Sequence, residues 1–418
     1  MNASAAIAAP DRRRGWVLAL CATTVMLVLS APGSAMPVLF PQIAADLGLS
    51  LVQVGVLWGA ASLAGAVFGL LGGMAADVLG TRVVVVTGCL VCAAAGAARS
   101  LAGGFAALAL FTLVLGIAGS PLPNSMHKVA GQWFSPRAFG MANSVIAVGV
   151  ASGAMLGSLV SAAYLAPLLG GWRGVLAVYG AVGAVFGVLW LVAPRPPLAE
   201  RAAGGSRGFA GFRATVAAVA PIKAFWILTA ACFCYSAYYM GFTGYLPTYL
   251  TDEGWSTAAA GAAAAAFQAA SLAGVVPLMF LAERFHLRRG LMAGAGVCAL
   301  AGTLVLATTA GPWVWAAVVL MGLFHDLFMT MAVTMVVQTG GIGAALAGTA
   351  LGLMMSLQRL GGFVSPPLGN SLAALGPGVP FLLWGGFAAA MLVLLTRVRS
   401  QRPDPERGGP EATAAGET

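Results

Sequence analysis

The sequence predicts an all-α membrane protein of twelve transmembrane helices, arranged as two parallel six-helix repeats around a central cavity. Of its 418 residues, 60% are apolar and only 8% are charged. A soluble domain carries about 25% charged residues, so this chain has too few charges to cover a water-exposed surface. The mean hydropathy of +0.92 agrees with this conclusion. Composition therefore excludes soluble globular, coiled-coil and disordered proteins.

Long apolar runs, separated by charged residues or by Gly and Pro, supply the predicted helices. About 20 residues cross a bilayer, and twelve runs have about that length or more: 15–40, 52–75, 82–101, 104–133, 138–165, 171–193, 223–248, 256–281, 289–309, 312–338, 346–372 and 377–397. The first run is too long for the apolar part of a cleaved signal peptide. All six cysteines lie inside these runs, so we expect small buried side chains rather than disulfides or a zinc site.

Basic residues gather on one side of the predicted helices. With the N-terminus inside, 17 of the 21 Lys and Arg residues face the cytoplasm, as the positive-inside rule requires. Arg99 and Arg173 are assigned to outer loops, and Lys128 and Arg359 to spans. We therefore expect a multi-pass protein of a bacterial-type inner (plasma) membrane with both termini cytoplasmic. The formal charge of +9 then reflects topology and contact with anionic headgroups of the lipid bilayer, so no nucleic-acid partner is expected.

An internal repeat divides the chain into two halves. A shift of 206 residues superposes two separate motifs: Pro41, Asp46, Gly48 and Ser50 fall on Pro247, Asp252, Gly254 and Ser256, and Asp77 and Arg82 fall on Glu283 and Arg288. One offset for both motifs indicates duplicated, parallel units. The expected organisation is a cytoplasmic N-terminal tail (1–14), a six-helix half (15–193), a cytoplasmic linker (194–222), a second six-helix half (223–397) and a disordered cytoplasmic tail (398–418).

Twelve spans in two parallel sixes resemble the major facilitator superfamily. The segment Gly73-x-x-x-Asp77-x-x-Gly80-x-Arg82 resembles the family's motif between its second and third helices, and Glu283, Arg284 and Arg288 resemble the degenerate copy in the second half. Val78 departs from the motif, where the family has a basic residue. The run from Pro123 to Arg137 is similar to the fourth-helix segment of the organic-anion and nitrate/cyanate branches. The resemblance implies a gating role for Asp77, Arg82, Glu283, Arg284 and Arg288; the alternative is that they only end helices and fix topology.

Ionisable residues inside predicted spans form the candidate transport site, because each costs on the order of 3 kcal/mol or more in a bilayer. Asp326 and His325 lie in the tenth span, Arg359 in the eleventh, and His127 and Lys128 in the fourth. Two polar stripes at four-residue spacing, which the shift of 206 superposes, indicate a shared aqueous path: Ser120, Asn124, Lys128 and Gln132, then Asp326, Thr330, Thr334 and Gln338. Helix–helix hydrogen bonding is the alternative for these stripes.

The charges within the spans suggest how an anion would be held. Arg359 can bind two carboxylate oxygens through its planar fork, and it resembles the eleventh-helix cation of the oxalate/formate and monocarboxylate carriers. If Arg359 pairs with Asp326 in the empty site, Lys128 remains to attract the anion. The other possibility is that the Arg359–Asp326 pair only locks the second half.

Five of the seven tyrosines lie in the seventh span. Tyr235, Tyr238 and Tyr239 are deep, and they are substrate-binding candidates together with Asn124, His127 and Gln268, since a tyrosine can both stack on a ligand and donate a hydrogen bond. Tyr245 and Tyr249 lie nearer the predicted outer side, where we expect them to join an interfacial aromatic belt.

These observations favour a secondary active transporter of a small organic anion, a monocarboxylate by preference, coupled to protons through Asp326 and His325. No P-loop, metal spacing or nucleophile constellation occurs, so an enzyme, a metal or a cofactor is not expected. Symport and antiport both stay open, and a monomer is expected. A proton-driven multidrug exporter is the main alternative, since the tenth span is rich in methionine, and a channel or non-transporting sensor is a more distant one.

The charge distribution predicts which loops an impermeant reagent can reach. Cysteines introduced by Gly204→Cys and Gly341→Cys should react from the cytoplasmic side only, and Gly170→Cys from the outside only. Maleimide labelling of intact cells and of inverted vesicles measures this. Labelling of position 204 from outside would reverse the orientation.

Overall fold

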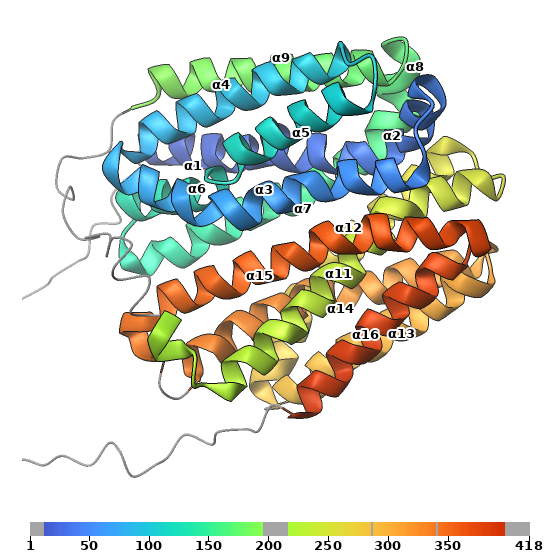
Figure 1. The fold of residues 1–418 in the computed structure, drawn as a ribbon. Helices are drawn as coiled ribbons and strands as arrows, with labels where there is room; N and C mark the ends of the chain where they lie inside the picture. Colours follow the sequence, from blue (N-terminus) through green and yellow to red (C-terminus); the bar gives the residue numbers. More distant parts are fainter. Residues whose placement is uncertain (1–11, 195–215, 286, 340–341, 398–418) are drawn as a thin grey trace, which may run out of the picture.

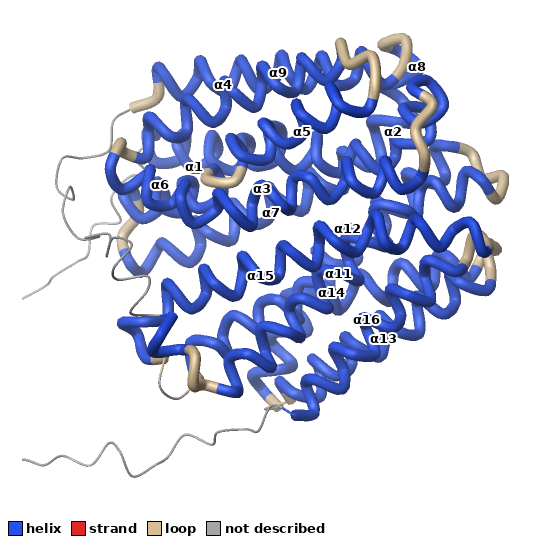
Figure 2. Tube along the Cα trace, in the orientation of Figure 1, coloured by secondary structure: helices blue, strands red, loops and turns tan. Residues whose placement is uncertain are grey.

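The computed structural model describes residues 12–194, 216–285, 287–339 and 342–397. Within these ranges every regular element is a helix and none is a strand (Figure 2). Eleven helical stretches are long and apolar enough to cross a membrane. The helix α15 (Gly343–Ser371) completes the expected twelve, although Gln358 and Arg359 interrupt its apolar sequence. The predicted C-terminal tail and most of the predicted N-terminal tail and linker lie outside the described residues, but residues 12–14 of the predicted N-terminal tail belong to α1.

The first half runs from α1 to α9 (Figure 1). Its elements are α1 (Arg12–Thr24), a π-helical segment (Val25–Ser30), α2 (Ala31–Leu47), α3 (Leu51–Val78), α4 (Thr81–Ser100), α5 (Phe105–Gly119), α6 (Leu122–Trp133), α7 (Pro136–Val160), a second π-helical segment (Ser161–Leu165), α8 (Ala166–Leu168) and α9 (Trp172–Val192). Several of these are consecutive parts of one bent span, since α1 continues through the π-helical segment into α2 without a loop.

The second half has fewer interruptions. Its elements are α11 (Lys223–Asp252), α12 (Thr257–Arg284), α13 (Arg288–Thr308), α14 (Trp313–Gln338), α15, a short 3-10 helix (Leu372–Leu375) and α16 (Val379–Arg397). The helix bounds follow the predicted shift of 206 residues. The bounds of α3 shifted in this way are those of α12, and the shifted bounds of α4 and α9 fall within two residues of those of α13 and α16.

Backbone conformation repeats as well. Gly48 and Gly254, which the shift relates, both follow a helix with positive φ, at 62° and 89°, a conformation that glycine adopts without a steric penalty. The prediction of two six-helix repeats is therefore confirmed.

Each half has its own apolar core. In the first half, Phe40, Leu108 and Trp172 belong to one buried cluster and Met126 and Trp190 to another. The second half likewise contains two clusters of its own. Five of the six cysteines are buried in these cores and Cys298 is half-buried, in line with the expectation of small buried side chains. Apolar packing thus stabilises each half internally, and only a few apolar side chains, such as Leu51 and Ala264, pack against the core of the other half.

The halves meet most closely at one end of the bundle, the end that carries Gly48 and Gly254, which we call the closed end. Here α3 packs against α15 and α7 against α12. A Cβ added to Gly55 of α3 would lie 2.7 Å from the backbone of Pro367, and Asn370 Nδ2 donates to the carbonyl oxygen of Leu51 at 2.8 Å. Only glycine permits so close a backbone approach.

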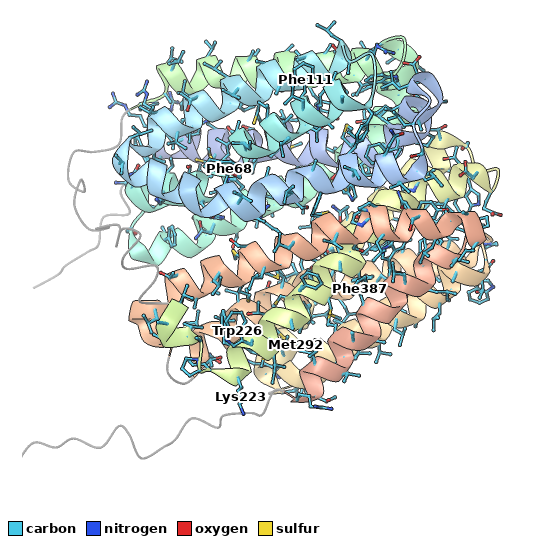
Figure 3. The ribbon with its side chains drawn as sticks, viewed as in Figure 1. Phe68, Phe111, Lys223, Trp226, Met292 and Phe387 are labelled. Atoms are coloured by element: carbon cyan, nitrogen blue, oxygen red, sulfur yellow. The ribbon has the colours of Figure 1, made fainter. Side chains whose placement is uncertain are left out.

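Toward the opposite end the halves separate. This end carries the start of α11, where Lys223 and Trp226 lie (Figure 3). A Cβ added to Gly69, nearly four turns along α3 from Gly55, would meet no atom within 4 Å. The ribbons of α3 and α15 diverge in the same direction (Figure 1).

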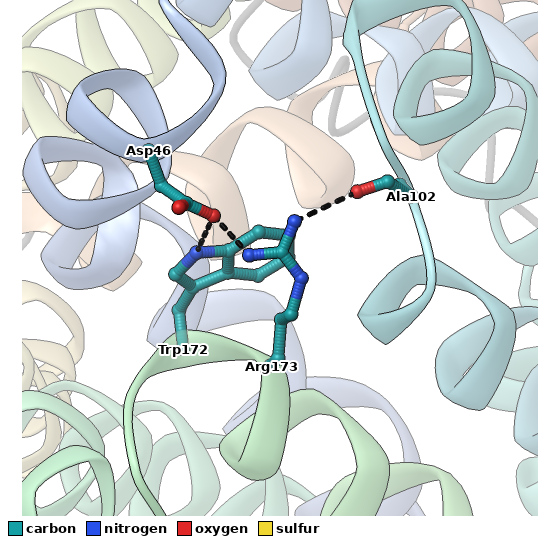
Figure 4. A network of polar contacts seen from close by, with 4 residues as sticks. All are labelled: Asp46, Ala102, Trp172 and Arg173. Atoms are coloured by element: carbon teal, nitrogen blue, oxygen red, sulfur yellow. Dashed lines mark hydrogen bonds and ion pairs between the residues drawn. The ribbon is translucent and has the colours of Figure 1, made fainter.

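A polar network joins three segments of the first half at the closed end (Figure 4). Asp46, at the end of α2, forms an ion pair with Arg173 and accepts a hydrogen bond from Trp172 Nε1 at 3.1 Å. Arg173 also donates to the carbonyl oxygen of Ala102 at 3.1 Å, and its guanidinium lies 4.3 Å from the Trp172 ring centroid. Both residues lie in the first turn of α9 rather than in a loop.

Arg99 differs from its predicted position. We expected it in an outer loop, but it lies in the last turn of α4 with only 2% of its surface exposed. The helix ends at Ser100, one residue before the predicted bound of 101.

The close approach at Gly55 predicts how the closed end can be opened. Gly55→Val would push its side chain into the α15 backbone, and overpacking of this kind costs about 1–3 kcal/mol. A Ser34→Cys reporter in the cavity described below should then react with a maleimide supplied at the closed end at least about fivefold faster. The matched control is Gly69→Val on the same helix, which meets no neighbour. Equal labelling rates in both variants would contradict the assignment of Gly55 to the closure.

Candidate functional site

A cavity of about 400 Å³ lies between the two halves, near the closed end. Both halves contribute side chains to it. Its lining residues are Ser34, Pro37, Trp58 and Ser158 from the first half and Tyr239, Phe242, Thr243, Leu246, Ala264, Phe267 and Gln268 from the second. Of the substrate-binding candidates predicted from sequence, Tyr239 and Gln268 lie in this lining. The position between two rigid halves is where a ligand can contact both at once.

His325 forms the centre of an aromatic cluster beside the cavity. Its ring is 4.1 Å from the centroid of Tyr239 and 5.1 Å from that of Phe267, and both of these residues line the cavity. The Tyr235 hydroxyl lies 2.9 Å from His325 Nδ1 and 3.0 Å from Nε2. The structure therefore brings together three candidates, His325 of α14 and Tyr235 and Tyr239 of α11.

Asp326 has a partner other than the one considered from sequence. Its carboxylate oxygen Oδ2 accepts a hydrogen bond from Ser271 Oγ of α12 at 2.7 Å. The ion pair with Arg359 is not formed, because Arg359 points toward the first half. Ser271 is related by the shift of 206 to Gly65 of α3. The second half thus has a hydroxyl at this position, whereas the first half has a glycine, against which the Arg359 guanidinium lies.

Arg359 lies in the middle of α15, at the surface that faces the first half. Its side chain is exposed, and its guanidinium lies so close to Gly65 that a Cβ at that position would collide with it. Among the residues described by the structure, the guanidinium has neither an ion-pair nor a hydrogen-bond partner. A cation with five donor hydrogens thus lies between the halves with no protein carboxylate beside it.

The fourth-span candidates lie on α6, outside the lining of the cavity. His127 Nδ1 is 2.8 Å from Asn143 Oδ1 of α7, so one candidate is engaged in a contact between neighbouring helices. Asn124 is exposed and Lys128 is half-buried. The structure does not bring these residues to Asp326 or His325.

The gating candidates lie at the end opposite the closed end. Arg82 donates to the carbonyl oxygen of Ala193 at 3.0 Å and to that of Leu191, so it caps the last turn of α9 within its own half. Arg288 Nη1 donates to Gln338 Oε1 at 3.4 Å, and the Arg284 guanidinium lies 5.9 Å from the Phe285 ring centroid. The side chains of Asp77 and Glu283 are outside the described part of the chain, so their pairing stays a prediction.

Three tyrosines of α11 are buried in the core of the second half, in contrast to the positions expected from sequence. Tyr245 and Tyr249 are 3% and 4% exposed, so the interfacial belt is wrong for both. They are buried because Phe381 of α16 packs on their rings, and Tyr245 donates to the carbonyl oxygen of Pro377 at 3.2 Å. Tyr238 is buried in the same core, stacked on Phe242 at 5.4 Å, and does not line the cavity.

Trp58 is the main lining residue that sequence reasoning missed. Its indole Nε1 donates to the carbonyl oxygen of Met240 on α11 at 2.8 Å, a hydrogen bond between the two halves. The repeat contained a signal for it, since two pairs related by the shift of 206 line the cavity: Pro37 with Thr243, and Trp58 with Ala264. No group of three metal-ligating side chains occurs in the described ranges.

Two parallel six-helix units that enclose a cavity between them define a twelve-helix membrane transporter. The sequence profile of the Major Facilitator Superfamily matches residues 18–366 and 251–417, and the chain belongs to this family. The family confirms the resemblance seen in the sequence and the expected class, a transporter and not an enzyme.

Individual relatives are more distant. The hexuronate transporter of Bacillus subtilis (strain 168) is 25% identical over 228 residues, a match that spans 53% of each chain and so about half the length of that relative. Among solved structures, an inward-facing, unoccupied bacterial homologue of the human lysosomal transporter Spinster has a TM-score of 0.74 at 18% identity, covering 93% of this chain and 95% of its own. The nucleoside transporter NupG has a TM-score of 0.74 at 15% identity, with coverage of 91% and 98%. These structures share the fold.

Proposed function

We propose that the chain is a secondary active transporter of a small carboxylate, coupled to protons and working by alternating access. The observation that carries this proposal is Arg359, an exposed guanidinium at the surface between the halves with no acidic partner among the described residues. An ionised side chain within a span is costly unless it serves a ligand or a partner. A carboxylate bound by its planar fork supplies that partner.

The cavity between the halves, whose lining does not include Arg359, offers groups for the rest of such a substrate. Gln268 and Thr243 offer polar groups, whereas Phe242, Phe267 and Trp58 offer apolar faces. This mixture fits a small molecule that carries hydroxyl groups on a carbon skeleton. The similarity to a hexuronate transporter supports the same class, because a hexuronate is a monocarboxylate with several hydroxyls.

Proton coupling is assigned to Asp326 and His325. They are adjacent in sequence but face different partners, Ser271 for Asp326 and Tyr235 for His325. A carboxylate and an imidazole can each change charge in the working pH range when their surroundings change. Opening of the closed end would alter the packing around His325, since Tyr239 and Phe267 contact its ring and line the cavity.

The expected topology assigns a state to the structure. With both termini in the cytoplasm of an inner membrane, the closed end faces outward and the cavity is reached from inside. The cytoplasmic basic residues Arg82, Arg284 and Arg288, with Asp77 and Glu283, would then act in the outward-open state, when their end closes. We expect a monomer, because the cavity is complete within one chain.

A proton-driven multidrug exporter is the second candidate. Its apolar wall would come from the methionines of α14, but Met321 and Met331 are 2% and 3% exposed and pack in the core of the second half. A channel is the third candidate, and counterflow separates it from a carrier, because only a carrier accelerates uptake by exchange.

Arg359→Lys tests the carboxylate anchor. An ammonium cannot reproduce the two-point fork, and loss of such a contact costs about 2–5 kcal/mol when the partner charge stays buried. Affinity for the transported carboxylate should fall at least about thirtyfold, measured by calorimetry on purified protein. Arg397→Lys, at the end of α16, is the control and should bind as the wild type does. Near-native affinity in Arg359→Lys would remove Arg359 as the anchor and leave Lys128.

Asp326→Asn tests the proton site. The amide retains a hydrogen bond to Ser271 but cannot titrate, so proton-driven accumulation should be lost while counterflow of pre-loaded substrate continues. Both are measured in proteoliposomes with and without an imposed pH gradient. Ser271→Ala is the matched control, since it removes the same hydrogen bond and keeps the acid. Proton-driven uptake by Asp326→Asn would transfer the role to His325.

A further inference from the structure

A second buried cation lies away from the cavity between the halves. Arg99, in the last turn of α4, is 2% exposed, and its Nε atom is buried without a hydrogen-bond partner. Within the described ranges no hydrogen bond or ion pair involves its side chain. The acidic group of the first half at the same end, Asp46, is already bound to Arg173 and Trp172. Arg99 therefore carries an uncompensated charge in the protein interior, which is strongly unfavourable.

Arg99 lines a separate cavity inside the first half. This cavity has a volume of about 380 Å³, its opening included, and is lined by α2, α3, α4 and α5. The other lining side chains include no carboxylate: Met36, Phe40, Leu57, Trp58 and Leu115 are apolar or aromatic, and Thr112 already donates its hydroxyl to Leu108 at 2.8 Å. The space beside the guanidinium is large enough for a small anion.

The internal repeat shows that the fold does not require a charge here. The shift of 206 relates Arg99 to Val305 of α13, which packs against the apolar core of the second half. The same helix position thus accommodates an apolar side chain in one half and a guanidinium in the other. The fold therefore does not explain the charge of Arg99. A ligand that neutralises this buried charge would explain it.

We propose that the cavity beside Arg99 is a binding site for a small monovalent anion, separate from the transport site at Arg359. Five guanidinium donors in an apolar cavity recognise a compact anion such as chloride or formate. Trp58 links this site to the closed end, because its ring lines both cavities and its indole nitrogen donates to Met240 of the second half. A bound anion would therefore stabilise the first half, which contributes Trp58 to the closed end.

The test is anion-dependent stability of the purified full chain in phosphatidylcholine nanodiscs. Sodium chloride or sodium formate is titrated at constant ionic strength, kept with sodium HEPES. The melting temperature of the wild type should rise with the logarithm of anion concentration above the dissociation constant. Arg99→Met should show no rise, and without chloride or formate it should be at least as stable as the wild type because it removes an unpaired buried charge. Arg359→Gln should keep the rise.

A second variant blocks the cavity without changing charge. Gly33 of α2 belongs to the lining, and a Cβ added there would meet no atom within 4 Å. Gly33→Val should therefore fold and lose the anion-dependent rise, and Gly69→Val, also in open space, should keep it.

Three results would overturn the proposal. A full rise in Arg99→Met and Gly33→Val would separate the anion from this cavity. Loss of the rise in Arg359→Gln alone would assign the anion to the transport site, which leaves the proposed function intact. A stability difference between the wild type and Arg99→Met that requires phosphatidylglycerol in the nanodisc would assign Arg99 to a lipid phosphate.

Discussion

The cost of an ionised side chain among membrane-spanning helices governs the arrangement of this protein. With 8% charged residues, the chain uses charge inside its helices at only a few positions, and each has a distinct environment. Asp326 is hydrogen-bonded to Ser271, Arg359 faces the other half, and Arg99 faces a separate cavity. The other buried polar side chains, such as Thr24, Thr229 and Asn370, are neutral, so the ionisable groups have most influence on where protons or anions can be stabilised.

The two halves are held together by a different kind of contact from the one that stabilises each of them. Large apolar side chains fill the cores within the halves, whereas glycine faces the other half at Gly55, Gly59 and Gly261. Backbone-to-backbone approach buries little side-chain surface. It therefore allows the halves to separate at the closed end without exposing a hydrophobic core, which a rocking motion between rigid units requires.

Hydropathy, charge asymmetry and the shift of 206 predicted most of the fold, because these patterns express the bilayer thickness and the duplication directly. The bounds of α3 and α12 agree with that shift to the residue. Side-chain partners were predicted less well. Tyr245 and Tyr249 lie at the depth expected for a belt, but burial depends on Phe381 of another helix. Likewise, Asp326 and Arg359 each lie near the middle of their helices but face different neighbours, and position along a helix does not give rotation about its axis.

The hydrogen bond from Trp58 to the carbonyl of Met240 has a consequence for the relative populations of the transport states. It joins the halves across the closed end, so under the proposed alternating access it would be broken when that end opens. A net contribution of about 1 kcal/mol for such a bond changes the ratio of the two states about fivefold. The indole is also a fluorophore whose surroundings change when the bond breaks. Because the chain has ten tryptophans, a variant that keeps Trp58 as its sole tryptophan would report the opening of the closed end by its fluorescence without an added label.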